Sequence, residues 1–345
     1  MWMHHVFRLA VAVIPSVSLL LSSHPSHADA VEDFYKGKTV RVIVGFPAGG
    51  GYDLYARQVA EFMGRFIPGR PTVIVQNMVG GGGVVAAKYM FEAAPRDGTT
   101  LGIVTQSLPL EVALQIEKFA IDLSSLSFVG RMASSVELGH GMPGAKFATF
   151  EDARRRELVV GASGSSDIGF LIAASLNKFA GSRFKIVTGY RAATEARLAA
   201  ERGEIDVVPS GGLATMMATR PEWITERKIP ILYQAALKRH ALLPDVATLQ
   251  ELALSEEGNT VLRLVASTGE IGRSVHAPPK VPSDRLAALR KAFLAMIHDS
   301  EFKSTMERRK IEIDPAPGEA IDAIVLDTLN TPRPLLDQLA ALIKR

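Results

Sequence analysis

The segment at residues 40–57 constrains the fold more than any other part of this chain. An apolar, β-branched run ends at Val44, a Pro/Gly loop follows, and Tyr52 opens a stretch with apolar residues at helical spacing. This order predicts a strand, a glycine loop and a helix. Loop amides without bulky side chains, followed by a helix N-terminus, suit the binding of an anion. The segment therefore predicts an α/β protein with an anion-binding loop.

The rest of the chain alternates between strand-like and helical runs. Strands are expected at 72–76, 101–105, 158–162, 184–188, 205–209 and 229–234. Helices are expected at 52–66, 84–94, 168–179, 194–202, 283–298 and 320–343, the last of them broken at Pro332-Arg333-Pro334. This alternation predicts mostly parallel sheets with helices on both faces. The pattern restarts near Gly130, which indicates two similar lobes. Ligands of such sheets bind at the C-terminal ends of the strands, so the cleft between the lobes is the expected site.

The first 30 residues are typical of a secretory signal peptide. A basic Arg8 precedes an apolar run at 9–21, and Ala28-Asp29-Ala30 is a small-x-small cleavage motif. The apolar run is shorter than the ~20 residues that span a bilayer. Cleavage is expected after Ala30, with Ala28 as the alternative, which predicts a periplasmic protein. The remaining chain is long enough for two domains.

Composition narrows the function classes. The chain has no cysteine, which excludes disulfides and thiolate catalysis. Its net charge is +3 with no dense Lys/Arg block, so no nucleic-acid partner is expected. The histidines are scattered and form no metal-binding motif, so neither a metal nor a cofactor is expected.

The first glycine loop matches nucleotide motifs only in part. Residues 45–50 have the glycine spacing of a P-loop, but Gly51 and Tyr52 stand where phosphate transfer needs Lys and Ser/Thr. Leu54 occupies the last glycine position of G-x-G-x-x-G, which removes the dinucleotide fingerprint. Asp53 is expected to cap backbone amides at the start of the helix, and contact with a ligand donor is the alternative.

A second Gly/Ser loop at 161–166 follows a predicted strand and precedes a helix. It falls short of the G-x-S-x-G nucleophile elbow because Ser165 replaces the final glycine. A secreted serine hydrolase using Ser163 or Ser165 stays an alternative, although no histidine sits in a partner motif. The same residues can hold a carboxylate at a helix N-terminus, or simply cap it. Arg191 ends another strand and suits a bidentate carboxylate contact, with a solvated surface arginine as the alternative.

Several segments resemble the periplasmic solute receptors of tripartite tricarboxylate transporters, the Bug or TctC-type family. The opening block at 42–53 with Ala56-Arg57 resembles the family's apolar strand, F-P-x-G-G, Asp and Ala-Arg signature. Weaker resemblances follow in the expected order at 73–83, 94–99, 188–191, 203–206 and 275–282. The resemblance implies an α/β, two-lobed type II periplasmic binding fold and a receptor without catalytic activity.

The resemblance also implies the ligand, the partners and the site. The expected ligand is an organic carboxylate, and the expected protein partner is a membrane permease. The protein is expected to be a monomer. A carboxylate sensor for a regulatory partner is an alternative role. The expected ligand-binding residues are Pro47, Gly49, Gly50, Gly51, Tyr52, Asp53, Thr105, Ser163, Gly164, Ser165, Ser166, Tyr190, Arg191 and Ser210. Gly51-Tyr52 replaces a small-polar pair common in the family, so a citrate-like ligand is not implied.

The same fold implies how the chain divides. The first lobe is expected to hold residues 31–133 and 268–345, and the second lobe residues 134–267. Two segments then cross between the lobes, and the hinge is expected at 131–135 and 268–272. Closure of such a hinge around the ligand is the behaviour of periplasmic binding proteins.

Overall fold

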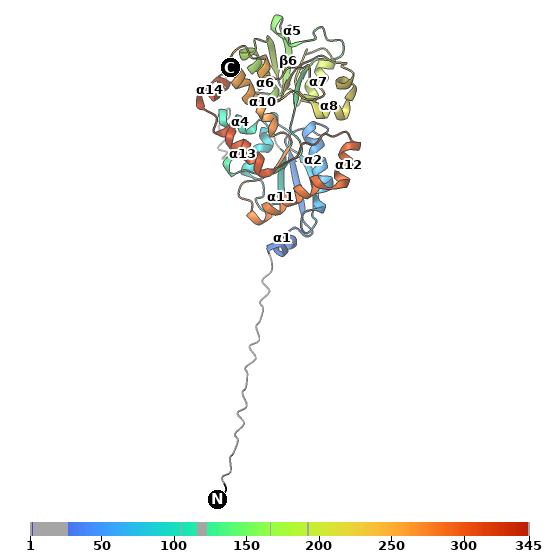
Figure 1. Cartoon of the computed structure of the whole chain (residues 1–345), viewed down its shortest axis with the longest axis vertical. Coiled ribbons are helices and arrows are strands. Elements are labelled where there is room, and N and C mark those ends of the chain that lie inside the picture. The colour runs from blue at the N-terminus through green and yellow to red at the C-terminus, as the bar shows by residue number, and fades with distance from the viewer. Residues whose placement is uncertain are drawn as a thin grey trace.

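The computed structural model describes residue 2 and residues 27–103, 105–115, 123–165, 167–191 and 193–343. These residues form two α/β lobes stacked along the long axis, with α1 (His27–Tyr35) at the outer end of the first lobe (Figure 1). Most of the predicted signal peptide lies outside the described residues, and α1 runs through both predicted cleavage positions. Among the helices in the described ranges, none has the length and apolar character needed to cross a membrane.

The first lobe is built on one six-stranded sheet in the order β11-β4-β10-β3-β1-β2. Its strands are β1 (Thr39–Val44), β2 (Thr72–Asn77), β3 (Thr100–Ile103), β4 (Ser127–Arg131), β10 (Ser274–Ala277) and β11 (Ala316–Pro317). Strand β1 is parallel to β2 and β3, but β10 is antiparallel to β3 and β4. The expected mostly parallel sheet is therefore mixed, because β10 carries the chain back from the second lobe.

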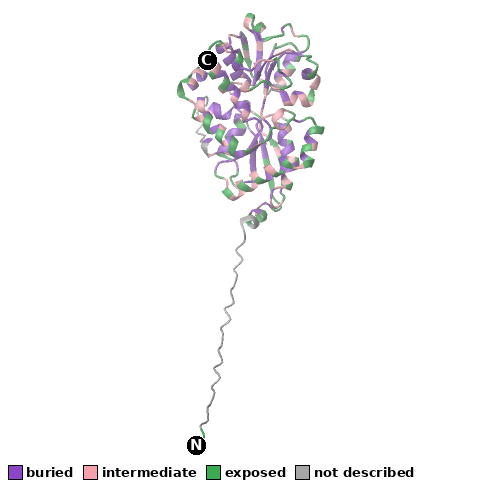
Figure 2. Ribbon diagram, in the orientation of Figure 1, coloured by how far each residue is buried: buried purple, intermediate pink, exposed green. Residues whose placement is uncertain are grey.

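Six helices cover this sheet and bury the β-branched residues at its centre. They are α2 (Gly51–Phe62), α3 (Val84–Glu92), α4 (Leu108–Leu114), α11 (Ser283–His298), α12 (Ser300–Arg308) and α13 (Gly318–Leu329). Val42 and Ile43 point to opposite faces of β1, and both are fully buried. Figure 2 shows the same pattern in both lobes, with buried residues along the sheets and exposed residues on the outer helices.

The second lobe holds two smaller sheets. The strands are β5 (Glu137–His140), β6 (Leu158–Ala162), β7 (Phe184–Thr188), β8 (Val208–Gly212) and β9 (Ile231–Ala235). The helices are α5 (Phe150–Arg155), α6 (Ile168–Phe179), α7 (Ala193–Glu201), α8 (Leu213–Thr219), α9 (Pro221–Thr225) and α10 (Glu256–Ser267). Because β8 is antiparallel to β5, Gly212 at its end pairs with Glu137, next to the crossing point between the lobes. Helix α8, which follows β8 directly, therefore begins beside the first lobe.

Two crossing segments run side by side where the lobes meet. The Met132 amide donates to the Arg273 carbonyl at 3.0 Å, and the Arg273 amide donates to the Ala133 carbonyl at 2.9 Å. The Ser135 amide donates to the Gly269 carbonyl at 2.8 Å. The bond from Ser135 to Gly269 lies within the two segments that the sequence suggests as a hinge, and Arg273 is the residue that follows the second segment.

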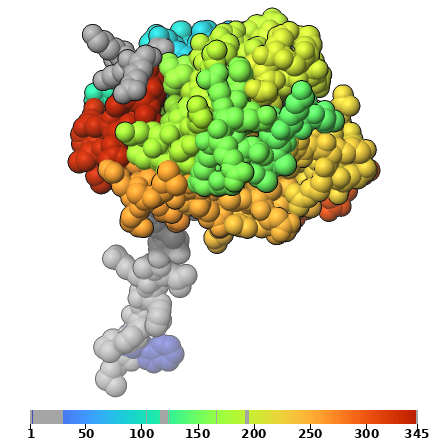
Figure 3. Space-filling model, turned by 90° about the horizontal axis from the view of Figure 1, so that it is seen from above, coloured from blue at the N-terminus to red at the C-terminus, as the bar shows by residue number. Residues whose placement is uncertain are grey.

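A third segment crosses at the C-terminus. Helix α14 (Arg333–Ile343) leaves the first lobe after α13 and buries Leu336 and Leu339 in the same core cluster as Ile172 of α6. In Figure 3, which looks onto the second lobe, the red C-terminal residues lie at its edge. This placement differs from the expected division, which assigned all of 268–345 to the first lobe. The apolar face of α14 explains its position, because it packs in a core cluster with α6 of the second lobe and with Leu110 and Leu114 of α4.

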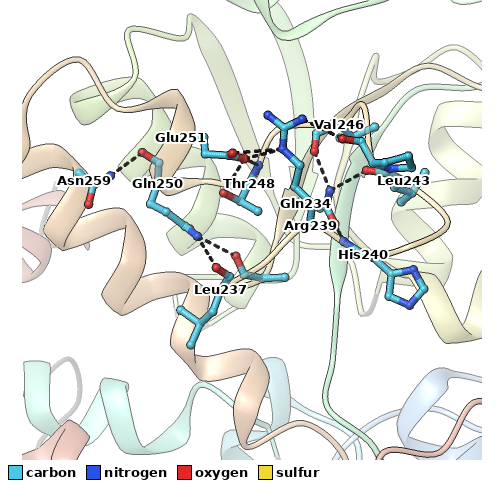
Figure 4. Close-up of polar contacts among 12 residues, drawn as sticks. Gln234, Leu237, Arg239, His240, Leu243, Val246, Thr248, Gln250, Glu251 and Asn259 are labelled. Carbon is cyan, nitrogen blue, oxygen red and sulfur yellow. Dashed lines mark hydrogen bonds and ion pairs between the residues drawn. The ribbon is translucent and has the colours of Figure 1, made fainter.

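A polar network holds the loop between β9 and α10 (Figure 4). The Gln234 side chain donates to the carbonyls of Leu243 and Val246 at 3.0 and 2.6 Å, and accepts the His240 amide at 2.7 Å. The loop thereby presents the His240 ring to the first lobe, where its Nε2 lies 3.2 Å from Oε1 of Glu312. The contact joins the two lobes beside the crossing segments.

Candidate functional site

A cavity of about 110 Å³ lies between the two lobes. The first lobe and the crossing segment contribute Phe46, Pro47, Gly50, Gly51, Tyr52, Gly82, Thr105 and Arg273 to its wall. The second lobe contributes Glu137, His140, Asp167, Ile168, Arg197, Val208, Ser210, Gly211, Gly212, Thr215 and Met216. Both lobes therefore form a single site, at the strand ends where ligands of α/β sheets bind.

The first-lobe loop is held by Asp53 rather than by an external group. Its carboxylate accepts the Gly49 amide at 2.9 Å, Nδ2 of Asn77 at 2.9 Å and Nε of Arg57 at 2.7 Å. Burial acts to raise the pKa of Asp53, but these hydrogen bonds outweigh it and lower that pKa. Gly49 has a φ of +81°, which glycine adopts at little cost. Asp53 thus holds the amide of Gly49 in the loop before α2, while the N-cap of that helix, Gly50, has no side-chain cap bond, and Asp53 does not line the cavity.

Tyr52 forms an aromatic wall on the first-lobe side. Its ring stacks on Phe46 with centroids 4.3 Å apart, and the Arg273 guanidinium lies 4.1 Å from the ring centroid. The phenol oxygen accepts the Gln106 amide at 3.1 Å. Burial raises the pKa of Tyr52, so the phenol stays neutral. The guanidinium over the ring is positioned as a cation–π pair.

Arg273 and Glu137 form a buried ion pair at the base of the cavity. Nη2 of Arg273 lies 3.1 Å from Oε1 of Glu137, and its Nη1 donates to Oε1 of Gln106 at 2.9 Å. Ser135 and Ser210 donate their hydroxyls to the Glu137 carboxylate. The two charges thus compensate each other and have hydrogen-bond partners, as buried charges require.

The second-lobe loop uses its polar groups internally. Asp167 accepts both the amide and the hydroxyl of Ser163 at 2.7 Å, and it caps α6 by accepting the Gly169 amide at 2.7 Å. Ser163 faces a small neighbouring cavity, and Ser165 is exposed. Among the four expected loop residues, Ser163, Gly164 and Ser165 do not line the main cavity, and Ser166 lies outside the described residues.

Tyr190 and Arg191 also lie away from the main cavity. The Tyr190 ring packs over Gly161, and the Arg191 side chain is 78% exposed and pairs with Glu195 at 3.4 Å. Arg191 thus matches the solvated alternative. Thr105 and Ser210 do line the cavity, and the Thr105 hydroxyl lies 2.6 Å from that of Ser107.

The lobes touch directly at Gly51 and Thr215. A Cβ at Gly51 would lie 2.6 Å from Oγ1 of Thr215, which belongs to α8 of the other lobe. Real side-chain atoms do not approach so closely, so Gly51 permits this contact. The arrangement is that of lobes closed over the cavity.

Among the described residues that line the cavity, two buried polar atoms lack a hydrogen-bond partner. Nδ1 of His140 lies 2.9 Å from the Gly141 carbonyl, while its buried Nε2 has no hydrogen-bond partner among the described residues. Burial lowers the pKa of His140 to about 4, so the ring is neutral. Nε of Arg197 is likewise buried without a hydrogen bond, and lies 3.9 Å from Oε1 of Glu201.

Sequence reasoning missed six of the polar residues in this wall. They are Glu137, His140, Asp167, Arg197, Thr215 and Arg273. Each sits outside a recognisable motif, and the fold brings them together from distant positions. The available signal was a polar or charged residue in a strand of otherwise small and apolar residues, as at Glu137 and His140. Within the described ranges, no cluster of acidic residues or histidines has the arrangement of a metal site.

Comparisons with known proteins agree with this architecture. Residues 55–340 match the family described as "Tripartite tricarboxylate transporter family receptor". A protein of Cupriavidus necator, "UPF0065 protein in gbd 5'region", is 27% identical over 77% of this chain and 79% of its own length. BugT of Bordetella pertussis is 33% identical over 33% of this chain and 36% of its own length.

Solved structures show the same fold. An R. palustris protein with adipate has a TM-score of 0.69 at 19% identity, covering 88% of this chain and 97% of that one. MatC from Rhodopseudomonas palustris with bound malate has a TM-score of 0.64 at 20% identity, covering 89% and 99%. The family match spans most of the chain and includes both lobes. This chain belongs to the tripartite tricarboxylate transporter receptor family.

Proposed function

We propose that this protein is a periplasmic receptor that encloses an organic carboxylate between its lobes and delivers it to a tripartite membrane transporter. The observation that carries the proposal is the cavity to which both lobes contribute, with the arginine side chains of Arg197 and Arg273 in its wall. Family membership supports the receptor role, and relatives with bound adipate and malate support a carboxylate ligand.

The route to the periplasm follows from the N-terminal segment. An Arg-containing start, an apolar run and the Ala28-Asp29-Ala30 motif support export and cleavage after Ala30. The mature protein then acts as a monomer that meets a membrane permease. N-terminal sequencing of the protein from a periplasmic extract tests the cleavage, and a start at Asp29 or Val31 distinguishes the two positions.

Ligand capture is tested by thermal shift with mono-, di- and tricarboxylates. A ligand that binds only the folded state raises stability by RT ln(1 + [L]/Kd), about 2.7 kcal/mol at 100 times Kd. Any carboxylate that raises Tm should also be taken up by cells in a manner that depends on this protein. If carboxylates of every class leave Tm unchanged, the proposal fails.

The hydrolase and sensor alternatives make different predictions. The Ser163 hydroxyl donates a hydrogen bond to Asp167. Within the described ranges, no histidine forms a hydrogen bond with Ser163. A nucleophilic serine needs such a base, so the contact favours binding over hydrolysis. Ester hydrolysis lost in Ser163→Ala would favour the hydrolase. A sensor would leave ligand uptake unchanged when the protein is deleted.

A further inference from the structure

Two unpartnered groups in the cavity wall restrict the chemistry of the ligand. Nε2 of His140 and Nε of Arg197 are both buried, and both residues line the cavity. A buried polar group without a partner costs free energy, so ligand binding is the natural point at which both groups find one. The two atoms need different partners, because Nε2 of His140 accepts a hydrogen bond and Nε of Arg197 donates one.

The tautomer of His140 follows from its backbone contact. The Gly141 carbonyl accepts a hydrogen bond and cannot donate one, so Nδ1 carries the ring proton. Nε2 then offers only a lone pair. Gly211 packs against this nitrogen, since a Cβ there would lie 2.5 Å from it. A group that satisfies Nε2 must donate a hydrogen.

Arg197 is less closely paired than Arg273, and its side chain is 26% exposed. Arg273 is matched by Glu137 at 3.1 Å, whereas the nearest acidic contact of Arg197 is 3.9 Å away, beyond hydrogen-bond range. The wall also includes the acidic residues Glu137 and Asp167. The charge of one ligand carboxylate is therefore compensated at Arg197. A second ligand carboxylate would be repelled by the acidic residues of the cavity wall.

Size and surface set further limits. At roughly 10–15 Å³ for each water-sized occupant, a volume of about 110 Å³ holds a ligand of about ten non-hydrogen atoms. Tyr52, Ile168, Val208 and Met216 give the wall apolar surface. The cavity thus suits a compact anion with an apolar body.

We propose that the ligand is a compact monocarboxylate with a hydroxyl group, whose carboxylate meets Arg197 and whose hydroxyl donates to Nε2 of His140. The proposal rests on the proposed function and specifies its ligand class. Loss of either contact leaves a buried polar group unsatisfied, which weakens affinity by about tenfold or more.

Calorimetry with matched acids tests the hydroxyl. The probes are lactate and propionate, mandelate and phenylacetate, and 3-hydroxybenzoate and benzoate, with adipate and citrate for comparison. In pairs that bind, the hydroxy acid should bind at least about tenfold more tightly than its partner. Equal affinities within the pairs, or tighter binding of adipate or citrate than of every monocarboxylate, would overturn the ligand class. Failure of every carboxylate would overturn the proposed function itself.

Variants assign the two contacts. In His140→Phe, the hydroxy acid and its matched acid should bind with about equal affinity. In His276→Phe, the preference for the hydroxy acid should be unchanged. His276 is a matched control because its Nε2 is also buried and unpartnered, but it lies away from this cavity. Arg197→Met should weaken every monocarboxylate that binds by at least about tenfold, and the exposed Arg191→Met should not. A preference that survives His140→Phe in a folded protein would remove His140 from the site.

Discussion

Glu137 and Arg273 join the second lobe to the crossing segment through an ion pair of 3.1 Å in which both side chains are more than nine-tenths buried. Glu137 opens β5 just after the chain enters the second lobe, and Arg273 lies where the chain leaves it. The pair therefore closes the base of the cavity between the two crossing segments, where the chain enters and leaves the second lobe.

Removal of one partner should destabilise the protein strongly. Arg273→Met leaves the Glu137 carboxylate buried without its cation, at a cost of about 3–5 kcal/mol in the free energy of unfolding. Glu137→Gln combined with Arg273→Met should cost less than the sum of the two single changes, because no charge then stays uncompensated. Urea denaturation of the four proteins measures this coupling. Additive costs would show that the pair contributes little as a unit.

Gly51→Ala should weaken ligand binding without unfolding the protein. Its added Cβ would lie 2.6 Å from Oγ1 of Thr215 and hold the lobes apart. Affinity should fall about tenfold, and Gly51→Ala with Thr215→Ala should recover most of it. Gly164→Ala is the control, since a Cβ there meets nothing within 4 Å. Calorimetry measures affinity, and X-ray scattering should show a larger radius of gyration for the single variant.

Asp53→Asn should loosen the first-lobe loop and lower stability by about 1–3 kcal/mol at pH 7. The folded-state pKa of Asp53 is lowered, so its contribution is present above the ordinary aspartate pKa and is lost as pH falls through the folded value. The stability difference between wild type and variant should therefore shrink below about pH 4. Urea denaturation at pH 7 and pH 3.5 compares them. A difference that is constant with pH would mean that the charge of Asp53 contributes nothing.

His140 and His276 should make the protein less stable in mild acid. Burial lowers both folded-state pKa values to about 4, below the ordinary 6.5. Between these values the unfolded chain binds protons that the folded protein does not, so stability falls as pH drops from 6.5. Each histidine should cost about 2 kcal/mol at pH 5 relative to pH 7. His276→Phe should lose less stability over this interval than wild type, and an equal loss would contradict the assignment.

Local patterns were sufficient for many elements of the fold. The helices Ile168–Phe179 and Ser283–His298 have the expected bounds, because their apolar spacing and flanking residues agree with the tertiary structure. Strand β8 was expected at 205–209 but spans Val208–Gly212. Pairing with β5 extends it through two glycines, and no local pattern contains that partner.

The candidate site shows where sequence reasoning ends. The first glycine loop was recognisable, since its residues are consecutive and their spacing is distinctive. Arg273 and Glu137 are far apart in the chain and meet only through the crossing segments, so neither carries a local signal. The second-lobe loop looked suited to an anion, but its hydroxyl donor Ser163 is already bonded to Asp167. The sequence identified hydrogen-bond donors in the loop, but it did not show which of them are already bonded to other residues of the protein.

The position of α14 has a consequence for how this chain is made. The core cluster around α6 includes Leu336, Leu339 and Ile343 of α14, which follow every strand of the second lobe in the chain. This core therefore stays incomplete along α6 until α14 has been synthesised. For an exported chain, the second lobe can complete its fold only after α14 has crossed the membrane.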